Sequence, residues 1–175
     1  SSCKNEPVVD KSNPFFSEFN TPFGVPPFDK IMAKHYLPAF EQGFAEGKKE
    51  IEAIISSKKK PTFNNTIVAL DKSGSLLTKV RSVFNCQTSA NTSDSLQNLE
   101  MEISPKISAY EDENRLNPEL FKSIKYVWDN PESYKLNSEQ KYTLDNIYKE
   151  FVRNGANLNS DDQEKLKSIN QKLSV

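Results

Sequence analysis

The stretch 33–57, AKHYLPAFEQGFAEGKKEIEAIISS, carries the clearest structural signal in the chain. Its large apolar residues recur at spacings of three, four, seven and four positions, which places them on one face of an α-helix. Pro38 lies near the start of the stretch, where a proline costs a helix little stability. The stretch therefore predicts a long amphipathic helix. The residues of its apolar face are Leu37, Phe40, Phe44, Ile51 and Ile55.

The segment after this helix predicts a second helix of similar length. Pro61 ends the first helix, and Thr62 is expected to cap the second one. Apolar residues at helical spacing continue from Ile67 past Gly74 to about Ala90. A glycine inside a helix costs about 1 kcal/mol relative to alanine. We therefore expect the second helix to continue through Gly74, with a neighbouring helix in close approach there. Whether the second helix is continuous with the third remains open.

Four further helices are predicted between residue 96 and the end of the chain. The third helix covers Leu96 to Tyr110 and should kink at Pro105, which lacks an amide proton. Cap residues indicate where the others begin, and a glycine in left-handed conformation is expected to end the fifth. No alternating strand pattern occurs, so the sequence predicts an all-α bundle of about six helices. The expected markers are Asn117 before Pro118, Ser138, Gly155, and Ser160 with Gln163.

The first 30 residues differ from the rest, because five prolines bias them toward extended and irregular structure. We predict that residues 1–12 form a flexible tail and that residues 13–175 form the helical domain. Five phenylalanines between positions 15 and 28 are more than a disordered linker carries. At least Phe15 and Phe28 are expected to pack in grooves between helices, either in this segment or in a missing part of the protein.

Charge and hydropathy exclude several classes of function. The chain has 175 residues, with 23 basic and 24 acidic side chains and a formal net charge of -1. Such a balance provides no field that would hold nucleic acid, so we expect no nucleic-acid partner. No apolar run reaches the roughly 20 residues that a membrane-spanning helix needs.

Catalytic and metal-binding patterns are missing from the sequence. A zinc peptidase needs two imidazoles on one helical face and a third ligand, but His35 is the single histidine. Its place at a helix start predicts a role in capping or packing. Cys86 follows Phe84 on a predicted helix and has no histidine base, which predicts a buried, inert thiol. We therefore predict no catalytic, cofactor-binding or metal-binding residue in this segment.

A series of short motifs, in order along the chain, nevertheless resembles one enzyme family. It begins with PPFDKI at 26–31, HYLPAFEQG at 35–43, PTFNNTI at 61–67 and ALDKSG at 69–74. It continues with LTKVRSVF at 77–84, FVRNGANL at 151–158 and KLKSINQKLS at 165–174. The series resembles the N-terminal part of the thimet-oligopeptidase family of zinc metallopeptidases, in particular its bacterial dipeptidyl carboxypeptidases. The similarity covers roughly residues 13–175.

The resemblance implies a larger, almost wholly helical, neurolysin-like fold with a deep channel. This segment would line one wall of the channel and restrict entry to short unfolded peptides. The missing C-terminal catalytic domain would be its partner and would hold zinc through H-E-x-x-H and a downstream glutamate. The parent enzyme would release dipeptides from the C-termini of short peptides, or cleave oligopeptides internally. The sixth predicted helix has no stop signal, so we expect the natural chain to continue beyond Val175.

The start of the chain suggests where the protein acts. Small residues before Cys3 and a polar run after it resemble the mature start of a bacterial lipoprotein, whose cysteine is acylated. By that reading the protein lies in the bacterial cell envelope, in the periplasm, tethered to a membrane through residues 1–12. The alternatives are that these residues come from an expression vector and that the protein is cytoplasmic. A free-standing, lipid-anchored helical scaffold without enzymatic activity is the alternative function.

Overall fold

The computed structural model describes residues 10, 12–90 and 93–173, and every regular element within these ranges is helical. The prediction of an all-α fold with about six helices is therefore confirmed. The principal helices are α1 (Ala33–Ile55), α3 (Ser75–Ala90), α4 (Asp94–Arg115), α5 (Pro118–Asp129), α6 (Ser138–Arg153) and α7 (Ser160–Leu173). Shorter turns are η1 (Pro14–Phe16), η2 (Pro22–Gly24), η3 (Phe63–Val68), α2 (Ala69–Lys72) and η4 (Pro131–Tyr134).

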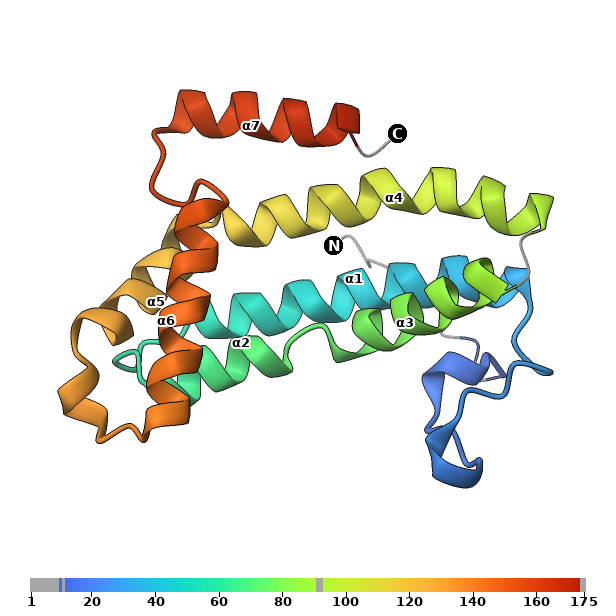
Figure 1. Cartoon of the computed structure of the whole chain (residues 1–175), viewed down its shortest axis with the longest axis horizontal. Coiled ribbons are helices and arrows are strands. Elements are labelled where there is room, and N and C mark those ends of the chain that lie inside the picture. The colour runs from blue at the N-terminus through green and yellow to red at the C-terminus, as the bar shows by residue number, and fades with distance from the viewer. Residues whose placement is uncertain (1–9, 11, 91–92, 174–175) are drawn as a thin grey trace, which may run out of the picture.

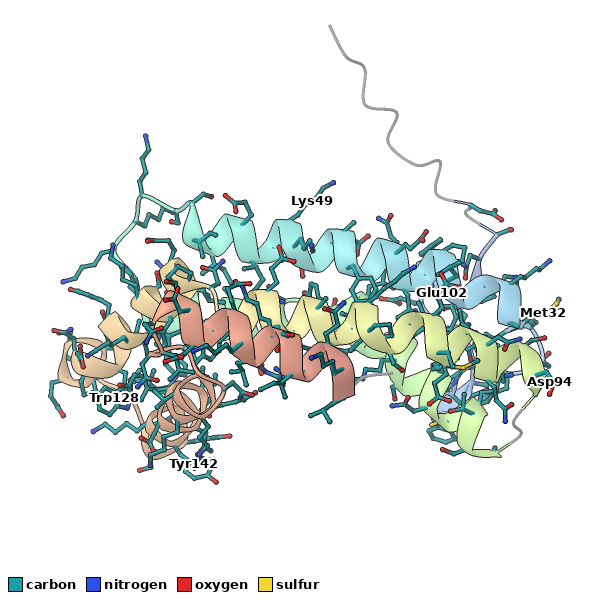
Figure 2. All side chains as sticks on the ribbon, turned by 90° about the horizontal axis from the view of Figure 1, so that it is seen from above. Met32, Lys49, Asp94, Glu102, Trp128 and Tyr142 are labelled. Carbon is teal, nitrogen blue, oxygen red and sulfur yellow. The ribbon has the colours of Figure 1, made fainter. Side chains whose placement is uncertain are left out.

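The long helices form an elongated layer, and a pair of shorter helices, α5 and α6, lies at one end of it, with α6 running across the long axis (Figure 1). Helices α1, α3 and α4 run side by side along the long axis, and α1 contacts both of the others. Helices α5 and α6 pack against each other at the end where α1 finishes. Helix α7 lies along α4 and contacts it. Met32 and Asp94 mark the opposite end, where α1 and α4 begin (Figure 2).

Two separate hydrophobic cores lie along α1. The first core joins α1, α3, α4 and η1, with Tyr36, Phe40 and Phe84 at its centre. The second core joins the end of α1 to η3, α5 and α6, with Ile51 and Ile124 among its members. Because α1 is 23 residues long, it contributes to both cores and connects them.

The segment before α1 is fixed to the first core by Phe15, as predicted. Phe15 is 1% exposed, and its ring lies 5.2 Å from that of Tyr36. The buried Asn13 side chain accepts a bond from the Phe15 amide at 3.1 Å and donates to the His35 carbonyl at 2.9 Å. Lys79 of α3 donates to the carbonyl oxygens of Phe15 and Ser17, at 3.2 and 2.7 Å. These bonds satisfy backbone groups that a non-helical segment would otherwise leave unpaired.

The second predicted helix is broken at Gly74, which corrects the expectation of a glycine inside a helix. Thr62 caps η3 as predicted, but α2 ends when Ser73 adopts an extended conformation. Gly74 then has φ +67°, which an L side chain rarely adopts. Its amide donates to the Glu50 carboxylate at 2.6 Å. A Cβ at this position would make only an ordinary 3.6 Å contact with Tyr110, so backbone conformation rather than close approach requires the glycine.

Two predicted helix starts are wrong by one residue. Asn137, not Ser138, caps α6, through a capping box with Gln140 at 2.9 and 3.0 Å. Asn159, not Ser160, accepts from the Asp162 amide at 2.9 Å at the start of α7. Asparagine and serine are both good N-cap residues, so the sequence does not distinguish between the two adjacent positions. Gln163 instead donates to the Gly155 carbonyl at 3.2 Å, so it joins α7 to the end of α6.

Other helix-boundary predictions are confirmed. Asn117 caps α5 with Pro118 at the first helical position. Gly155 has φ +91° after α6, and the Ala156 amide bonds to the Phe151 carbonyl, which is the bond of a Schellman motif. Helix α4 continues through Pro105, where the kink stays a prediction. Phe28 does not pack within this segment, because its side chain is 41% exposed, and its packing on a part of the protein outside the chain stays a prediction.

Candidate functional site

The single histidine has a structural contact. His35 lies in the first turn of α1, and its Nδ1 accepts a bond from the Met32 amide at 3.1 Å. This bond satisfies one of the amide groups that a helix start leaves without a partner, and it confirms the predicted capping role.

The prediction for Cys86 is wrong, because its thiol is exposed. On α3 the buried face is formed by Val80, Val83 and Phe84, which pack in the first core. Cys86 lies two residues after Phe84, which is about 200° around the helix and therefore on the opposite side. Cys3, the candidate lipidation site, lies outside the described residues.

Metal-ligating side chains do not gather in the part of the chain that the structure describes. Within residues 10, 12–90 and 93–173, no group of three or more histidine, cysteine, aspartate or glutamate side chains is arranged to hold a metal ion. Acidic side chains are instead paired along helix surfaces, such as Glu111 with Arg81 and Arg115 at 2.5 and 2.8 Å. A zinc ion would therefore need ligands from other residues.

Of the helices in the described ranges, none combines the length and apolar character needed to cross a membrane.

A cleft of about 580 Å³ lies between α4 and α7. Its walls combine polar and apolar groups, and a hydrogen bond crosses between the helices, from Asn170 Nδ2 to Asp112 Oδ1 at 2.8 Å. Lys167 is paired with Glu164 at 2.7 Å on the α7 side. Carboxamides, carboxylates and a lysine can bind the backbone groups of an extended peptide, so this cleft can hold a polar ligand. The sequence did not predict it, because it depends on how α7 packs on α4.

Helix α7 also presents an apolar stripe that is exposed toward the end of the helix. Leu166, Ile169 and Leu173 follow one another at helical spacing, and Ile169 and Leu173 are 53% and 79% exposed. Leu158 joins the stripe, because both it and Leu166 pack over Gly155.

A second exposed apolar surface lies before α1, in residues 21–32, which we call the arm. Phe23 at its tip is fully exposed, and Val25, Phe28 and Met32 are also exposed. Figure 1 shows η2 hanging away from the layer of long helices, while η1 stays close to it. The sequence predicted irregular structure for the arm, and packing of its aromatic side chains in this segment or in a missing part of the protein; within the described residues Phe23 and Phe28 are exposed.

Comparison with known proteins identifies the relatives of this chain. It is 42% identical over 158 residues to the dipeptidyl carboxypeptidase of Escherichia coli (strain K12), and this match covers 90% of the chain. The chain is homologous to the dipeptidyl carboxypeptidases. A second dipeptidyl carboxypeptidase, from Salmonella typhimurium, is 38% identical over 159 residues and 91% of the chain. Oligopeptidase A of Escherichia coli is 25% identical over 154 residues. No protein-family profile matches the chain.

The matches cover only a small part of each relative. The chain spans 23% of the length of these relatives, all of which are named as peptidases. The resemblance to an N-terminal segment of this family, inferred from ordered motifs, is therefore confirmed. A segment of this size without a catalytic constellation in its described residues is compatible with a longer enzyme.

Proposed function

We propose that the chain is the N-terminal helical part of a zinc-dependent peptidyl-dipeptidase, which releases dipeptides from the C-termini of short peptides. The observation that carries this proposal is the 42% identity to a dipeptidyl carboxypeptidase over 90% of the chain. The catalytic domain of the same polypeptide is the proposed partner. Zinc belongs to that domain, because the described residues of this segment do not form a suitable ligand group.

The degree of similarity favours dipeptide release over internal cleavage. Dipeptidyl carboxypeptidases are 42% and 38% identical to the chain, whereas the oligopeptidases A are 25% and 23% identical over a similar length. Both kinds of relative match 88–91% of the chain, so the difference does not arise from coverage.

In the proposed enzyme the segment forms one wall of the channel through which peptides reach the zinc ion. The cleft between α4 and α7 supports this role, because it offers polar groups to a peptide backbone without any catalytic group. The two hydrophobic cores support it as well, because they hold the long helices as a firm wall. A narrow, rigid entrance admits short unfolded peptides and excludes folded proteins.

The protein is proposed to act in the periplasm, anchored to a membrane by acylation of Cys3. The polar residues up to Ser12 would then separate the anchor from Asn13 and Phe15, where the segment joins the first core. Mass spectrometry of the N-terminus of the natural protein tests this point. An unmodified cysteine, or one preceded by uncleaved residues, would contradict it.

Metal analysis and a peptide-cleavage assay test the enzymatic proposal. The full-length protein should contain stoichiometric zinc, and a chelator should abolish its activity. Residues 1–175 alone should neither retain stoichiometric zinc nor cleave peptides. Turnover by the 1–175 segment, lost on addition of chelator, would show that the catalytic centre lies here and would refute the proposal.

A further inference from the structure

The arm presents more apolar surface to solvent than any other short part of the described chain. Phe23 is 104% exposed, and Val25, Phe28 and Met32 are each between 41% and 55% exposed, all within ten positions. Exposed apolar residues are ordinary when scattered singly, but a concentration of them marks an interaction site. Phe15, eight residues before Phe23, shows that the same segment can bury an aromatic ring.

Local hydrogen bonds hold the tip of the arm, while Ile31 near its base is buried in the first core. The Gly24 amide bonds to the Thr21 carbonyl at 3.0 Å, and the Thr21 hydroxyl donates to the Val25 carbonyl. Phe23 has φ +60°, an uncommon and strained conformation for a bulky residue. Three prolines at positions 22, 26 and 27 restrict the backbone further. Such an arm has lost much of its conformational freedom before it meets a partner, which favours binding.

We propose that the arm docks, through Phe23, Val25 and Phe28, into an apolar pocket on the part of the full-length polypeptide outside this chain. The inference rests on the proposed function, in which a catalytic domain of the same polypeptide is present. It specifies which surface of the segment contacts that domain, and by which chemistry. The chain spans only 23% of its relatives' length, so most of a protein of that size is available to form the pocket.

The size of the surface favours a partner in the same polypeptide. The four side chains expose on the order of 400 Å², since one aromatic side chain presents about 150–250 Å². A stable interface between separate proteins buries about 800 Å² on each partner. A covalently linked partner is present at a high effective concentration, so a smaller apolar contact is sufficient.

The charges beside the arm do not favour a lipid surface. Asp29 and Lys30 are adjacent and both exposed, and their charges cancel. Segments that bind anionic membranes through inserted aromatic residues carry an excess of lysine and arginine around them. A second copy of the chain is disfavoured by the same small area that favours an intramolecular partner.

Hydroxyl-radical footprinting of the full-length protein tests the docking. The oxidation rate of Phe23 is measured in the native and the denatured protein, with the buried Phe15 as reference. Docking predicts native oxidation slower by about tenfold, because a side chain in a core loses more than nine-tenths of its exposed area. A native rate within about twofold of the denatured rate would overturn the proposal, because such a side chain is as exposed as in an unfolded chain.

A variant in the full-length protein adds a second readout. Phe23→Asn keeps the turn, because asparagine tolerates positive φ, but it removes the docking ring. It should increase oxidation of Phe28 by about threefold, toward its rate when undocked, and leave Phe15 protected. The matched control is Tyr142→Asn, which replaces an exposed aromatic on α6 and should leave Phe28 unchanged. No change at Phe28 in Phe23→Asn would also overturn the proposal.

Two further outcomes would reassign the arm and thereby refute the inference. Protection of Phe23 that appears only with vesicles of anionic phospholipid would assign the arm to a membrane. Protection that increases with protein concentration would assign it to a second copy. These readouts do not depend on catalysis. If the arm is protected but the protein is inactive, only the enzymatic proposal is refuted. If the arm is exposed but the enzyme is active, only the docking inference is refuted.

Discussion

Tyr36 makes the stability of the folded chain depend on pH, because its side chain is buried in the first core. Its side chain is fully buried, and its hydroxyl donates to Gln87 Oε1 at 2.5 Å. Burial, together with the neighbouring charge of Cys86, raises the pKa of Tyr36 to about 12. The folded state therefore favours the neutral phenol more strongly than the unfolded state does.

The raised pKa predicts a loss of stability in alkali. The contribution is complete below the ordinary tyrosine pKa of about 10 and disappears as pH rises from there to about 12. Over that range Tyr36 should account for a decrease of roughly 2–3 kcal/mol in the free energy of unfolding. Tyr36→Phe should lose about 1 kcal/mol near neutral pH, because Gln87 loses its partner, but should decline less in alkali. Denaturant unfolding of both proteins at several pH values measures the difference, and parallel declines would contradict the assignment.

Gly43 is the residue at which α1 and α3 approach each other. A Cβ there would lie 3.0 Å from the Leu77 Cα and 3.1 Å from its amide nitrogen, and backbone atoms cannot move aside cheaply. Gly43→Ala should destabilise the chain by roughly 1–3 kcal/mol, although alanine is the better helix former. Glu41→Ala, at an exposed position on the same helix, is the control and should stay within about 0.5 kcal/mol. Thermal unfolding decides, and a stabilised Gly43→Ala protein would show that the two helices can separate.

At the scale of whole elements, the start of α6 distinguishes the observed cap from the predicted one. Asn137 accepts from the Gln140 amide, whereas Ser138 is already inside the helix. Asn137→Ala should therefore cost about 1 kcal/mol of stability, and Ser138→Ala should cost little. Chemical denaturation of the two variants measures this difference. A larger loss for Ser138→Ala would restore the sequence-based assignment.

The sequence predicted the positions of the helices better than the breaks between them. The spacing of apolar residues located α1 and α5 well, because an amphipathic face follows from local order alone. The break at Gly74 was not predicted, because a glycine fits both a helix and a left-handed turn, and the Glu50 carboxylate that accepts a bond from its amide is 24 residues away. The prediction for Cys86 was wrong for a different reason. The buried face of α3 was predicted correctly, but Cys86 lies on the opposite side of the helix from that face.

The candidate site was less predictable than the fold. Ordered motifs indicated the peptidase relatives, and the comparisons confirmed them. The α4–α7 cleft forms where α7 packs on α4, and the bond between Asn170 and Asp112 that crosses there joins residues 58 positions apart. The exposed arm depends on a positive φ at Phe23, which no residue pattern indicates for an aromatic side chain.

At the scale of the whole molecule, the described chain is an elongated layer of helices with two hydrophobic cores and two exposed apolar surfaces. Helix α1 joins the cores, and the exposed surfaces are the arm and the stripe on α7. The cleft lies between α4 and α7. These features support the proposal that the segment shapes the access of peptides to a catalytic centre elsewhere in a larger enzyme.

Product analysis of the full-length protein tests this account most directly. An N-terminally acetylated peptide of about six residues is incubated with the enzyme, and the products are identified by mass spectrometry. The account predicts that a free C-terminal dipeptide and a shortened acetylated peptide accumulate together, and that a chelator stops both. Cleavage at internal bonds without dipeptide release, or no cleavage by a folded protein supplied with zinc, would contradict it.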